Sequence, residues 1–348
     1  MTASHTTAYR EHLLPADDSP PKPRWTKALI AGIGVTAALA VGTVSFVITH
    51  PYEQGAPSEH HRPTKEHPVI AASPNTRLRI INGCAKDPLW IANFAFNKSY
   101  IPQDLKLEAG AAHEFAIPEE GLAATRFWAK WGCDAKGNAC EIGQSGGPGE
   151  SCGPDGCDPP IDSKFEATFG CMPGSKTPCA VNPSDLTQQI GPTDWWDVSQ
   201  VDGWTLPYKV DIVGECPMAP KQIDCSRLSL HSCPTNEDLG LGGKGESLQL
   251  LGSDGTVAGC YAPCAKLTYS QLGQGHTFTP ESPEAQNYCC PTPPITPAQC
   301  SAGPVIQTQY VKAVHELCPG VYAYAYDDGM GLAQCPAGTR YDVTFYCP

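Results

Sequence analysis

Eighteen cysteines lie between Cys84 and Cys347, and none lies in the 83 residues before them. An even number of thiols in an acidic chain rich in Gly and Pro is typical of a disulfide-bonded protein that folds in an oxidising compartment. Zinc is the other common reason for clustered cysteines, but here the gaps are irregular and no C-x-x-C pair is repeated. We therefore expect an exported, cross-linked domain without a metal site.

The cysteine-free part contains one long apolar run, from Ala28 to Ile48, of 21 residues without a charge. Such a run is long enough for a helix that crosses a bilayer core of about 30 Å. Lys22, Arg24 and Lys27 precede it, and the positive-inside rule then keeps residues 1–27 in the cytoplasm. The run predicts a type II membrane protein with a transmembrane signal-anchor helix over residues 28–48 and an extracellular or lumenal C-terminal domain. A cleaved signal peptide, followed by secretion, is the open alternative.

Two further regions follow the apolar run. Residues 49–75 are rich in Pro, His and Glu without apolar periodicity, which predicts an extended stalk. Residues 76–348 hold all the cysteines and are expected to form one folded domain. The formal net charge of −13 disfavours nucleic acid, which needs a basic surface, and no glycine-rich strand-to-helix turn indicates a phosphate-bearing cofactor. We expect no cofactor and no nucleic-acid partner.

Short apolar or alternating runs predict the strands of this domain. They cover residues 77–82, 89–96, 113–118, 126–132, 164–169, 208–213 and 341–347. One helix is predicted after Pro304, where Ile306, Tyr310, Val314 and Leu317 recur at a spacing of three to four residues. The sequence therefore predicts a mainly β domain with a smaller helical lobe.

Several segments, in order along the chain, match one known family. The first and last strands contain Arg77-Leu-Arg-Ile-Ile-Asn-Gly-Cys84 and Tyr341-Asp-Val-Thr-Phe-Tyr-Cys-Pro348. Between them lie Arg126-Phe-Trp128, Trp195-Trp-Asp-Val-Ser-Gln-Val-Asp-Gly-Trp204 and Cys318-Pro-Gly-Val-Tyr-Ala-Tyr-Ala-Tyr-Asp-Asp328. With these motifs the chain resembles a thaumatin-like protein, the group that includes thaumatin, osmotin and pathogenesis-related family 5. The resemblance covers nearly all of residues 76–348 and implies a thaumatin-like β-sandwich core with helical and loop lobes stapled by disulfides.

The resemblance also implies how the cysteines pair. The family's eight bridges, matched in order, fall on Cys84–Cys347, Cys133–Cys140, Cys152–Cys157, Cys216–Cys335, Cys225–Cys318, Cys233–Cys260, Cys264–Cys289 and Cys290–Cys300. Cys171 and Cys179 remain, in a segment of residues 170–194 that smaller members lack, and we expect a ninth, local bridge between them. The chain departs from the family at residues 141–151, which replace a short turn beside the family's cleft.

Family members that act on fungi have a cleft lined by one arginine and four acids. The resemblance implies that these ligand-binding residues are Arg126, Glu166, Asp197, Asp202 and Asp327, with Asp328 left open as the alternative to Asp327. Strand alternation independently puts Glu166 on the polar face of its strand together with Lys164. Asp197 and Asp202 are an odd number of positions apart, so a turn or bulge near Gly203 has to bring them together.

An acidic groove around one arginine can accept hydrogen bonds from sugar hydroxyls. We expect it to bind a β-1,3-glucan or a related wall polysaccharide, in the defence or cell-wall role that the resemblance implies. The alternative is a weak endo-β-1,3-glucanase, a glycoside hydrolase in which Glu166 is the acid and Asp197 or Asp202 the base or nucleophile. A third class is an ectodomain that recognises a protein target without binding sugar. The sequence leaves open whether the chain is an enzyme.

The remaining polar motifs predict little chemistry. Asn97 lies in an acceptable N-glycosylation sequon, which the exported topology makes usable. His231, His276 and His315 are isolated in the sequence, have no arrangement that supports nucleophilic catalysis, and are predicted to be surface residues. We expect the ectodomain to be monomeric.

Overall fold

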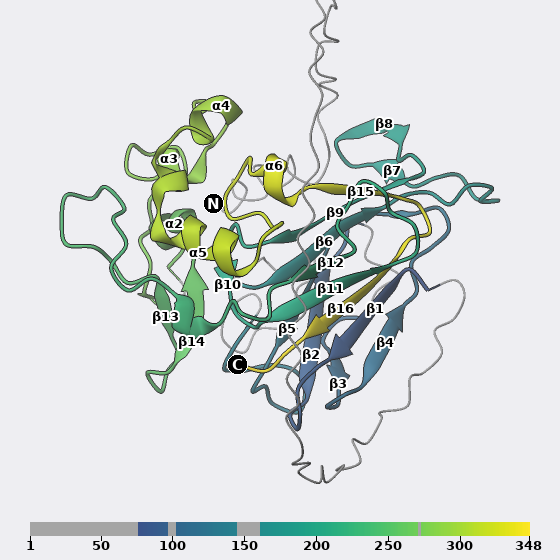
Figure 1. Cartoon of the computed structure of the whole chain (residues 1–348), viewed down its shortest axis with the longest axis horizontal. Helices are drawn as coiled ribbons and strands as arrows, with labels where there is room; N and C mark the ends of the chain where they lie inside the picture. Colours follow the sequence, from purple (N-terminus) through teal and green to yellow (C-terminus); the bar gives the residue numbers. More distant parts are fainter. Residues whose placement is uncertain (1–75, 97–101, 145–160, 271–272) are drawn as a thin grey trace, which may run out of the picture. The chain divides into compact units, whose positions relative to one another are not determined.

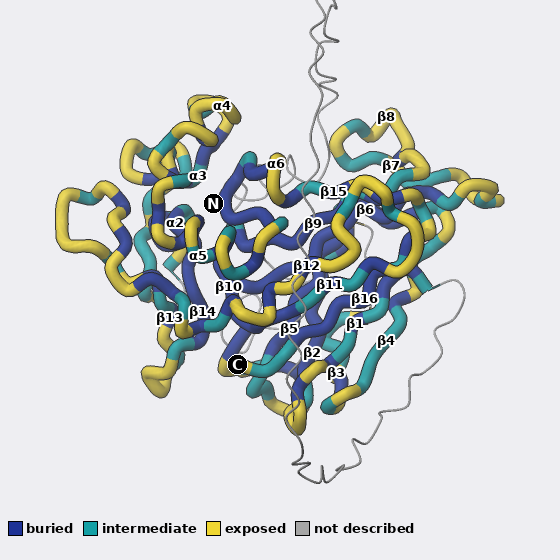
Figure 2. Tube along the Cα trace, in the orientation of Figure 1, coloured by how far each residue is buried: buried dark blue, intermediate teal, exposed yellow. Residues whose placement is uncertain are grey.

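The computed structural model describes residues 76–96, 102–144, 161–270 and 273–348, and two large β-sheets are the main feature of this part of the chain (Figure 1). The predicted mainly β fold class is confirmed, because the helices are few and short. Buried backbone follows the strands of both sheets, whereas the loops at their ends are exposed (Figure 2).

One sheet has five strands in the order β12-β11-β16-β1-β4. They are β1 (Leu78–Asn82), β4 (Ala112–Phe115), β11 (Tyr208–Val213), β12 (Gln222–Asp224) and β16 (Arg340–Phe345). The first and last of the described strands, β1 and β16, lie side by side in parallel, with Leu78 opposite Tyr341. The bridge Cys84–Cys347 joins the chain just beyond both strands, so the two ends of the domain are covalently linked.

The other sheet has six strands in the order β15-β9-β6-β5-β2-β3, and every neighbouring pair is antiparallel. They are β2 (Leu89–Phe94), β3 (Leu105–Leu107), β5 (Leu122–Lys130), β6 (Lys164–Phe169), β9 (Thr193–Ser199) and β15 (Ala333–Pro336). Its central strands β5, β6 and β9 carry most of the predicted site residues.

Aromatic side chains fill the space between the two sheets. Tyr341 on β16 lies 5.6 Å from Phe165 on β6 and 5.4 Å from Trp196 on β9, measured between ring centroids. Phe115 on β4 meets Phe127 on β5 at 5.1 Å. All five side chains are buried, and burying one large apolar side chain contributes about 1.5–3 kcal/mol. One face of β5, β6 and β9 is therefore fixed against the five-stranded sheet.

A smaller lobe of short elements lies beside the sheets (Figure 1). Its three strands have the order β10-β14-β13, and they are β10 (Gly203–Trp204), β13 (Gln249–Leu251) and β14 (Val257–Tyr261). Its α-helices are α2 (Pro263–Thr268), α3 (Gln286–Cys289), α4 (Pro297–Cys300) and α5 (Gln309–Leu317), and its 3₁₀ helices are η2 (Leu230–Ser232) and η4 (Pro304–Gln307). Four bridges hold these elements: Cys225–Cys318, Cys233–Cys260, Cys264–Cys289 and Cys290–Cys300.

Two further elements complete the described fold. The hairpin of β7 (Val181–Asn182) and β8 (Asp185–Gln189) follows the local bridge Cys171–Cys179, and helix α6 (Asp328–Gly331) precedes β15. Cys133–Cys140 and Cys216–Cys335 are the other bonded pairs. The bonded pairs are those that the resemblance implied, with the local ninth bridge, while Cys152 and Cys157 lie outside the described residues.

The predicted elements match the structure unevenly. Strands β6 and β11 have the predicted bounds, and the other predicted strands differ at one or both ends. The predicted helix divides at Thr308, whose side chain caps α5 after the turn of η4. The predicted helix is present as α5, but α2, α3, α4 and α6 were not predicted, because each is too short to show apolar periodicity.

Among the described residues, no helix has both the length and the apolar character needed to cross a bilayer. The predicted cytoplasmic tail over residues 1–27, the anchor over residues 28–48, the stalk over residues 49–75 and the sequon at Asn97 lie outside the described part of the chain. Those expectations stay predictions.

Candidate functional site

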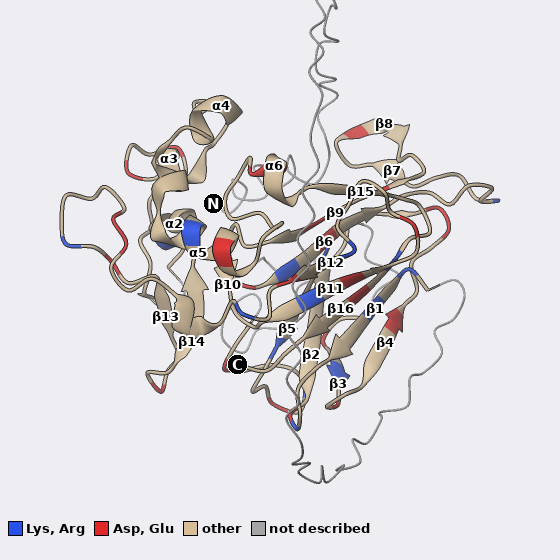
Figure 3. Cartoon of the chain, viewed as in Figure 1, with Lys and Arg blue, Asp and Glu red and all other residues tan. Residues whose placement is uncertain are grey.

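Three predicted site residues form a row across the centre of the six-stranded sheet. Arg126 on β5 lies directly opposite Glu166 on β6, and Glu166 lies directly opposite Asp197 on β9. Directly opposite residues point to the same face, with Cβ atoms about 4.5–5.5 Å apart. The three side chains are therefore neighbours on the face that points away from Phe165 and the five-stranded sheet. Charged positions on the strands of this sheet are coloured in Figure 3.

This second face of the sheet is buried as well. Every residue of β6 is buried, including Lys164 and Glu166 on the face that alternation assigns to polar residues. The exposed fractions are 6% for Arg126, 4% for Glu166 and 4% for Asp197. The row is thus a buried polar layer rather than an open charged surface, and its charges act in a partly desolvated environment.

Arg126 is paired with the first acid of the row. Its Nε atom lies 2.6 Å from Oε1 of Glu166, in an ion pair whose alignment does not meet the geometry of a hydrogen bond. Burial raises the pKa of Glu166, although the positive charges of Arg126 and Lys164 oppose the shift. Glu166 therefore holds a proton at a higher pH than an exposed glutamate, which is the property that a general acid requires.

Asp197 is the second acid of the row, and its pKa lies well above the usual range. Burial is the largest cause, and the negative charges of Glu166 and Asp328 add to it, against the opposing charge of Arg126. Its Oδ1 atom is buried and has no hydrogen-bond partner among the described residues. Because an unsatisfied buried acceptor costs about 1–3 kcal/mol, a donor supplied by a ligand would be stabilising here.

Asp202 is connected to the row by its ion pair with the buried side chain of Lys164. Lys164 Nζ donates to Oδ2 of Asp202 at 2.7 Å, and the Asp202 side chain is 20% exposed while that of Lys164 is fully buried. The predicted turn lies between β9 and β10, where Gly203 has a φ of 140°. A Cβ atom on Gly203 would lie 2.1 Å from the carbonyl oxygen of Cys260, so the close approach requires glycine.

A tyrosine-rich loop, residues 322–328, brings the last acids toward β9. Tyr322 pairs in parallel with Ser199: its N–H donates to Val198 O at 3.0 Å, and Gln200 N–H donates to Tyr322 O at 2.8 Å. The Tyr322 hydroxyl donates to Oδ1 of Asp328. Asp328 is exposed, and its charge acts on Asp197.

Asp327 has a different environment from its neighbour. It is 4% exposed, and its Oδ2 atom accepts the N–H of Ala323 at 3.0 Å and lies 2.7 Å from Nε2 of His315 on α5. The structure thus brings Asp328 close enough for its charge to act on Asp197, and gives Asp327 the contacts of a residue that fixes the loop.

The prediction that three histidines lie at the surface is only partly met. His276 and His315 are partly buried, and each is paired with an acid: His315 with Asp327, and His276 with Glu246 at 2.9 Å. The sequence could not reveal these pairs, because each forms only when the chain folds back on itself. His231 is exposed, as predicted.

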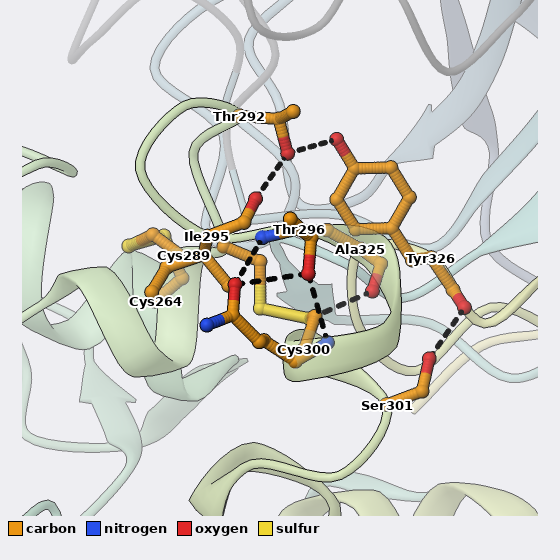
Figure 4. Close-up of a disulfide and its surroundings, with 11 residues drawn as sticks. Cys264, Cys289, Thr292, Ile295, Thr296, Cys300, Ser301, Ala325 and Tyr326 are labelled. Atoms are coloured by element: carbon orange, nitrogen blue, oxygen red, sulfur yellow. Dashed lines mark hydrogen bonds between the residues drawn. A yellow bond between two sulfur atoms is a disulfide. The ribbon is translucent and has the colours of Figure 1, made fainter.

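The smaller lobe braces the other side of the tyrosine-rich loop. The Tyr326 hydroxyl donates to Oγ1 of Thr292 at 2.7 Å, and Ser301 Oγ contacts the Tyr326 carbonyl oxygen at 3.5 Å (Figure 4). Cys300, bonded to Cys290, lies against Ala325 in the same view, with its Sγ atom 3.3 Å from the Ala325 carbonyl oxygen. The loop is therefore held between β9 and the segment that carries α4.

Sequence reasoning missed Tyr322 and Lys164 as parts of the site. Tyr322 connects the loop to β9 through its backbone and to Asp328 through its hydroxyl. Lys164 links Glu166 electrostatically to Asp202. The alternation of β6 puts Lys164 on the same face as Glu166, so this pattern could have identified the lysine. Nothing in the sequence distinguishes Tyr322 from the other tyrosines of the loop.

The arrangement combines one arginine with acids of differing exposure. Asp202 and Asp328 offer carboxylate oxygens near the surface, and the buried pair of Glu166 and Asp197 includes a carboxyl group that can stay protonated. Such a set can accept hydrogen bonds from sugar hydroxyls and donate hydrogen bonds to them. Glycoside hydrolysis also uses a pair of carboxyl groups. Within the described residues, no group of three or more His, Cys, Asp or Glu side chains is arranged to hold a metal ion.

Comparisons with known proteins agree with the fold. A model of the thaumatin family matches residues 82–348. A glucan endo-1,3-beta-glucosidase from Prunus avium is 32% identical over 70% of this chain and 78% of its own length. Thaumatin-like protein 2 from Prunus persica is 29% identical over 75% of this chain and 86% of its own length. The solved structure of the thaumatin-like xylanase inhibitor TLXI aligns over 78% of this chain and 99% of its own, with 13% identity and a TM-score of 0.29.

Proposed function

Because this chain belongs to the thaumatin family, we propose that its domain binds a β-1,3-glucan-type wall polysaccharide at the acidic site, in a defence or cell-wall role. The observation that carries this proposal is the row of Arg126, Glu166 and Asp197 on one face of the sheet. Its acceptors and protonated carboxyl groups suit a neutral ligand rich in hydroxyl groups. A polyanion would be repelled by the chain's net charge of −13.

The more exposed acids would make the first contacts with the ligand. Asp202 and Asp328 offer carboxylate oxygens near the surface, whereas the Glu166 and Asp197 side chains are nearly buried. A hydroxyl group that reached the buried Oδ1 of Asp197 would satisfy an acceptor that is otherwise unpartnered among the described residues. Binding then gains from an interaction that the free protein lacks.

Weak endo-β-1,3-glucanase activity is a second candidate. Its support is the raised pKa of Glu166, which lets this group act as a proton donor, and the similarity to the glucan endo-1,3-beta-glucosidase from Prunus avium. Of the two acids that the sequence offers as base or nucleophile, Asp202 would take this role, because the raised pKa of Asp197 favours its protonated form. Carboxyl groups about 5–5.5 Å apart retain the anomeric configuration, and groups about 6.5–9.5 Å apart invert it.

A panel of insoluble polysaccharides distinguishes these functions. The full-length chain is incubated with each, and both the protein in the pellet and the sugars released into solution are measured. Binding without hydrolysis predicts retention on β-1,3-glucan and no products, and Asp328→Asn weakens the retention. Hydrolysis predicts short oligosaccharides that disappear in Glu166→Gln. A chain that neither binds nor cleaves contradicts both candidates and leaves recognition of a protein partner.

Membrane tethering is proposed for the same chain on the basis of its sequence. Residues 28–48 would anchor the protein with the domain outside the cell or in a lumen, and Asn97 would carry a glycan. Alkaline carbonate should leave the full-length chain in the membrane fraction and release a variant that lacks residues 28–48. Release of both into the soluble fraction would support secretion after signal cleavage. Treatment with an N-glycosidase should reduce the mass of the wild-type chain but not that of Asn97→Gln.

A further inference from the structure

The row of charged residues continues onto an aromatic side chain that the acidic site does not include. Phe94, the last residue of β2, lies directly opposite Arg126 on β5. Its ring centroid is 5.4 Å from Cζ of Arg126, within the range of a cation–π contact. Phe94, Arg126, Glu166 and Asp197 therefore occupy four neighbouring strands on one face, over about 14 Å at the usual strand spacing.

Phe94 is only partly covered. It packs against the buried cluster of Ala92 and Trp128, which lie on the same face of β2 and β5, yet Phe94 itself remains partly exposed. Strand β3 pairs with β2 only as far as Ile91. Two residues further along β2, at Asn93, the side chain of Gln103 takes the place of a neighbouring strand. Its amide oxygen accepts the Asn93 N–H at 2.8 Å, and its amide nitrogen donates to the Asn93 carbonyl oxygen at 2.7 Å. Phe94 thus lies beyond the part of β2 that pairs with β3.

We propose that Phe94 is an aromatic subsite that stacks against one pyranose ring of the glucan, beside the hydrogen-bonding groups of Arg126 and Glu166. This inference rests on the proposed function and adds a contact that no acid of the row supplies. A β-linked glucose unit has C–H groups on its two faces and hydroxyl groups at its edge. It therefore matches a surface with an aromatic ring at one end and hydrogen-bonding groups along the rest.

The contact with Arg126 holds the Phe94 ring in one orientation. A guanidinium group held over one part of the ring, together with the packing on Trp128, restricts the motion of the Phe94 side chain. A platform that is ordered before binding loses less conformational entropy when the sugar arrives. Phe94 would thereby orient the polysaccharide along the row, with successive units passing over Arg126 toward the acids.

Three substitutions of Phe94 in the full-length chain test the subsite. Phe94→Leu keeps apolar packing on Ala92 and Trp128 but removes the ring, and Phe94→Tyr keeps the ring. The affinity for insoluble β-1,3-glucan should fall about fivefold or more in Phe94→Leu and stay within about twofold of wild type in Phe94→Tyr. Leu186→Ala, at a side chain that is 68% exposed on β8, is the control and should bind as wild type does.

Phe94→Trp adds a direct readout, which keeps the test valid even if Phe94→Leu unfolds. Addition of a soluble β-1,3-glucan should change the fluorescence of the new indole relative to the wild-type background. Equal affinity of wild type and a folded Phe94→Leu, or an indole signal that does not respond, overturns the subsite while leaving glucan binding intact. A wild-type chain that binds no β-1,3-glucan overturns the proposed function and the subsite together.

Discussion

The acidic site has two halves that are built differently. Arg126, Glu166 and Asp197 come from three adjacent strands and are fixed by the backbone ladder of the sheet. The tyrosine-rich loop, residues 322–328, has two backbone hydrogen bonds to β9 and otherwise depends on side chains, through His315 and the contact of Tyr326 with Thr292.

This difference separates two kinds of stability. Moving a residue of the sheet half would break strand pairing that also holds the core, so its geometry is as stable as the fold. The loop half can lose one side-chain contact at a time, because each of its bonds contributes about 0.5–1.5 kcal/mol. Substitutions in the sheet half should therefore affect folding strongly, and those in the loop half should affect the site more than the fold.

The largest effect is expected from Arg126→Ala. It removes the cation from a buried ion pair and leaves Glu166 beside Asp197, so the free energy of unfolding should fall by about 3–5 kcal/mol. Denaturant unfolding measures the change. Lys106→Ala, in the exposed ion pair of Lys106 with Glu108, is the control and should have little effect. An Arg126→Ala variant as stable as that control would show that the sheet half is not held by its charges.

The pH dependence of stability should be marked and should depend on Asp197. Its pKa is raised in the folded state, so above about pH 4 the folded protein holds a proton that the unfolded chain has lost. The free energy of unfolding therefore falls as pH rises from this point toward the folded-state pKa, by about 1.4 kcal/mol for each unit of the shift. Asp197→Asn should remove this contribution and reduce the slope, while Asp162, Asp194 and Glu166, whose pKa values are also raised, keep theirs.

Unfolding of both proteins at pH values between 4 and 8 checks the pH prediction. Asp238→Asn, at an exposed acid, is the control and should follow the wild-type profile. Parallel profiles for wild type and Asp197→Asn would contradict the account of a buried, protonated acid in the sheet half.

In the loop half, His315→Ala should have a moderate effect. It removes the partner of Asp327, a carboxylate that is 4% exposed, and should lower the free energy of unfolding by about 1–2 kcal/mol. Glucan affinity should fall as well, because Asp328 is then less well placed. His231→Ala, at an exposed histidine, serves as the control. Unchanged affinity in His315→Ala would mean that this contact does not position the loop.

The smallest effect is expected from Tyr326→Phe. It removes the hydrogen bond to Thr292 but keeps the ring, so stability should fall by about 0.5–1 kcal/mol. Thermal unfolding of the variant against wild type measures this. If Tyr326→Phe lowered the stability as much as Arg126→Ala does, the sheet half and the loop half would not differ in the way proposed.

The sequence predicts the sheet half better than the loop half for a physical reason. Strand alternation has a fixed period, so the bounds of β6 and the face of Glu166 and Lys164 follow from the residues themselves. The burial of that face does not, because it depends on segments distant in the sequence. Apart from the local bridge Cys171–Cys179, the bonded cysteines outside residues 145–160 followed the family pattern, which no spacing rule could have supplied.

The loop half contains what local pattern cannot specify. Asp327 and Asp328 are adjacent and chemically alike. Asp327 is nevertheless buried and paired with His315, whereas Asp328 is exposed and its charge acts on Asp197. The bonds of Ala323 and Tyr322 hold the two acids in these places, and the loop itself is positioned by the pairing of Tyr322 with Ser199, a residue distant in the sequence. The short helices of the smaller lobe were missed for another reason, because helices of four to six residues are too short to show apolar periodicity.

The most direct test of the account is whether both halves contact one ligand. The affinity for soluble β-1,3-glucan is measured for wild type, Glu166→Gln in the sheet half and Asp328→Asn in the loop half. The account predicts that each substitution weakens binding about fivefold or more while the protein stays folded. Binding that is lost in one variant and unchanged in the other would contradict a single site formed by sheet and loop together.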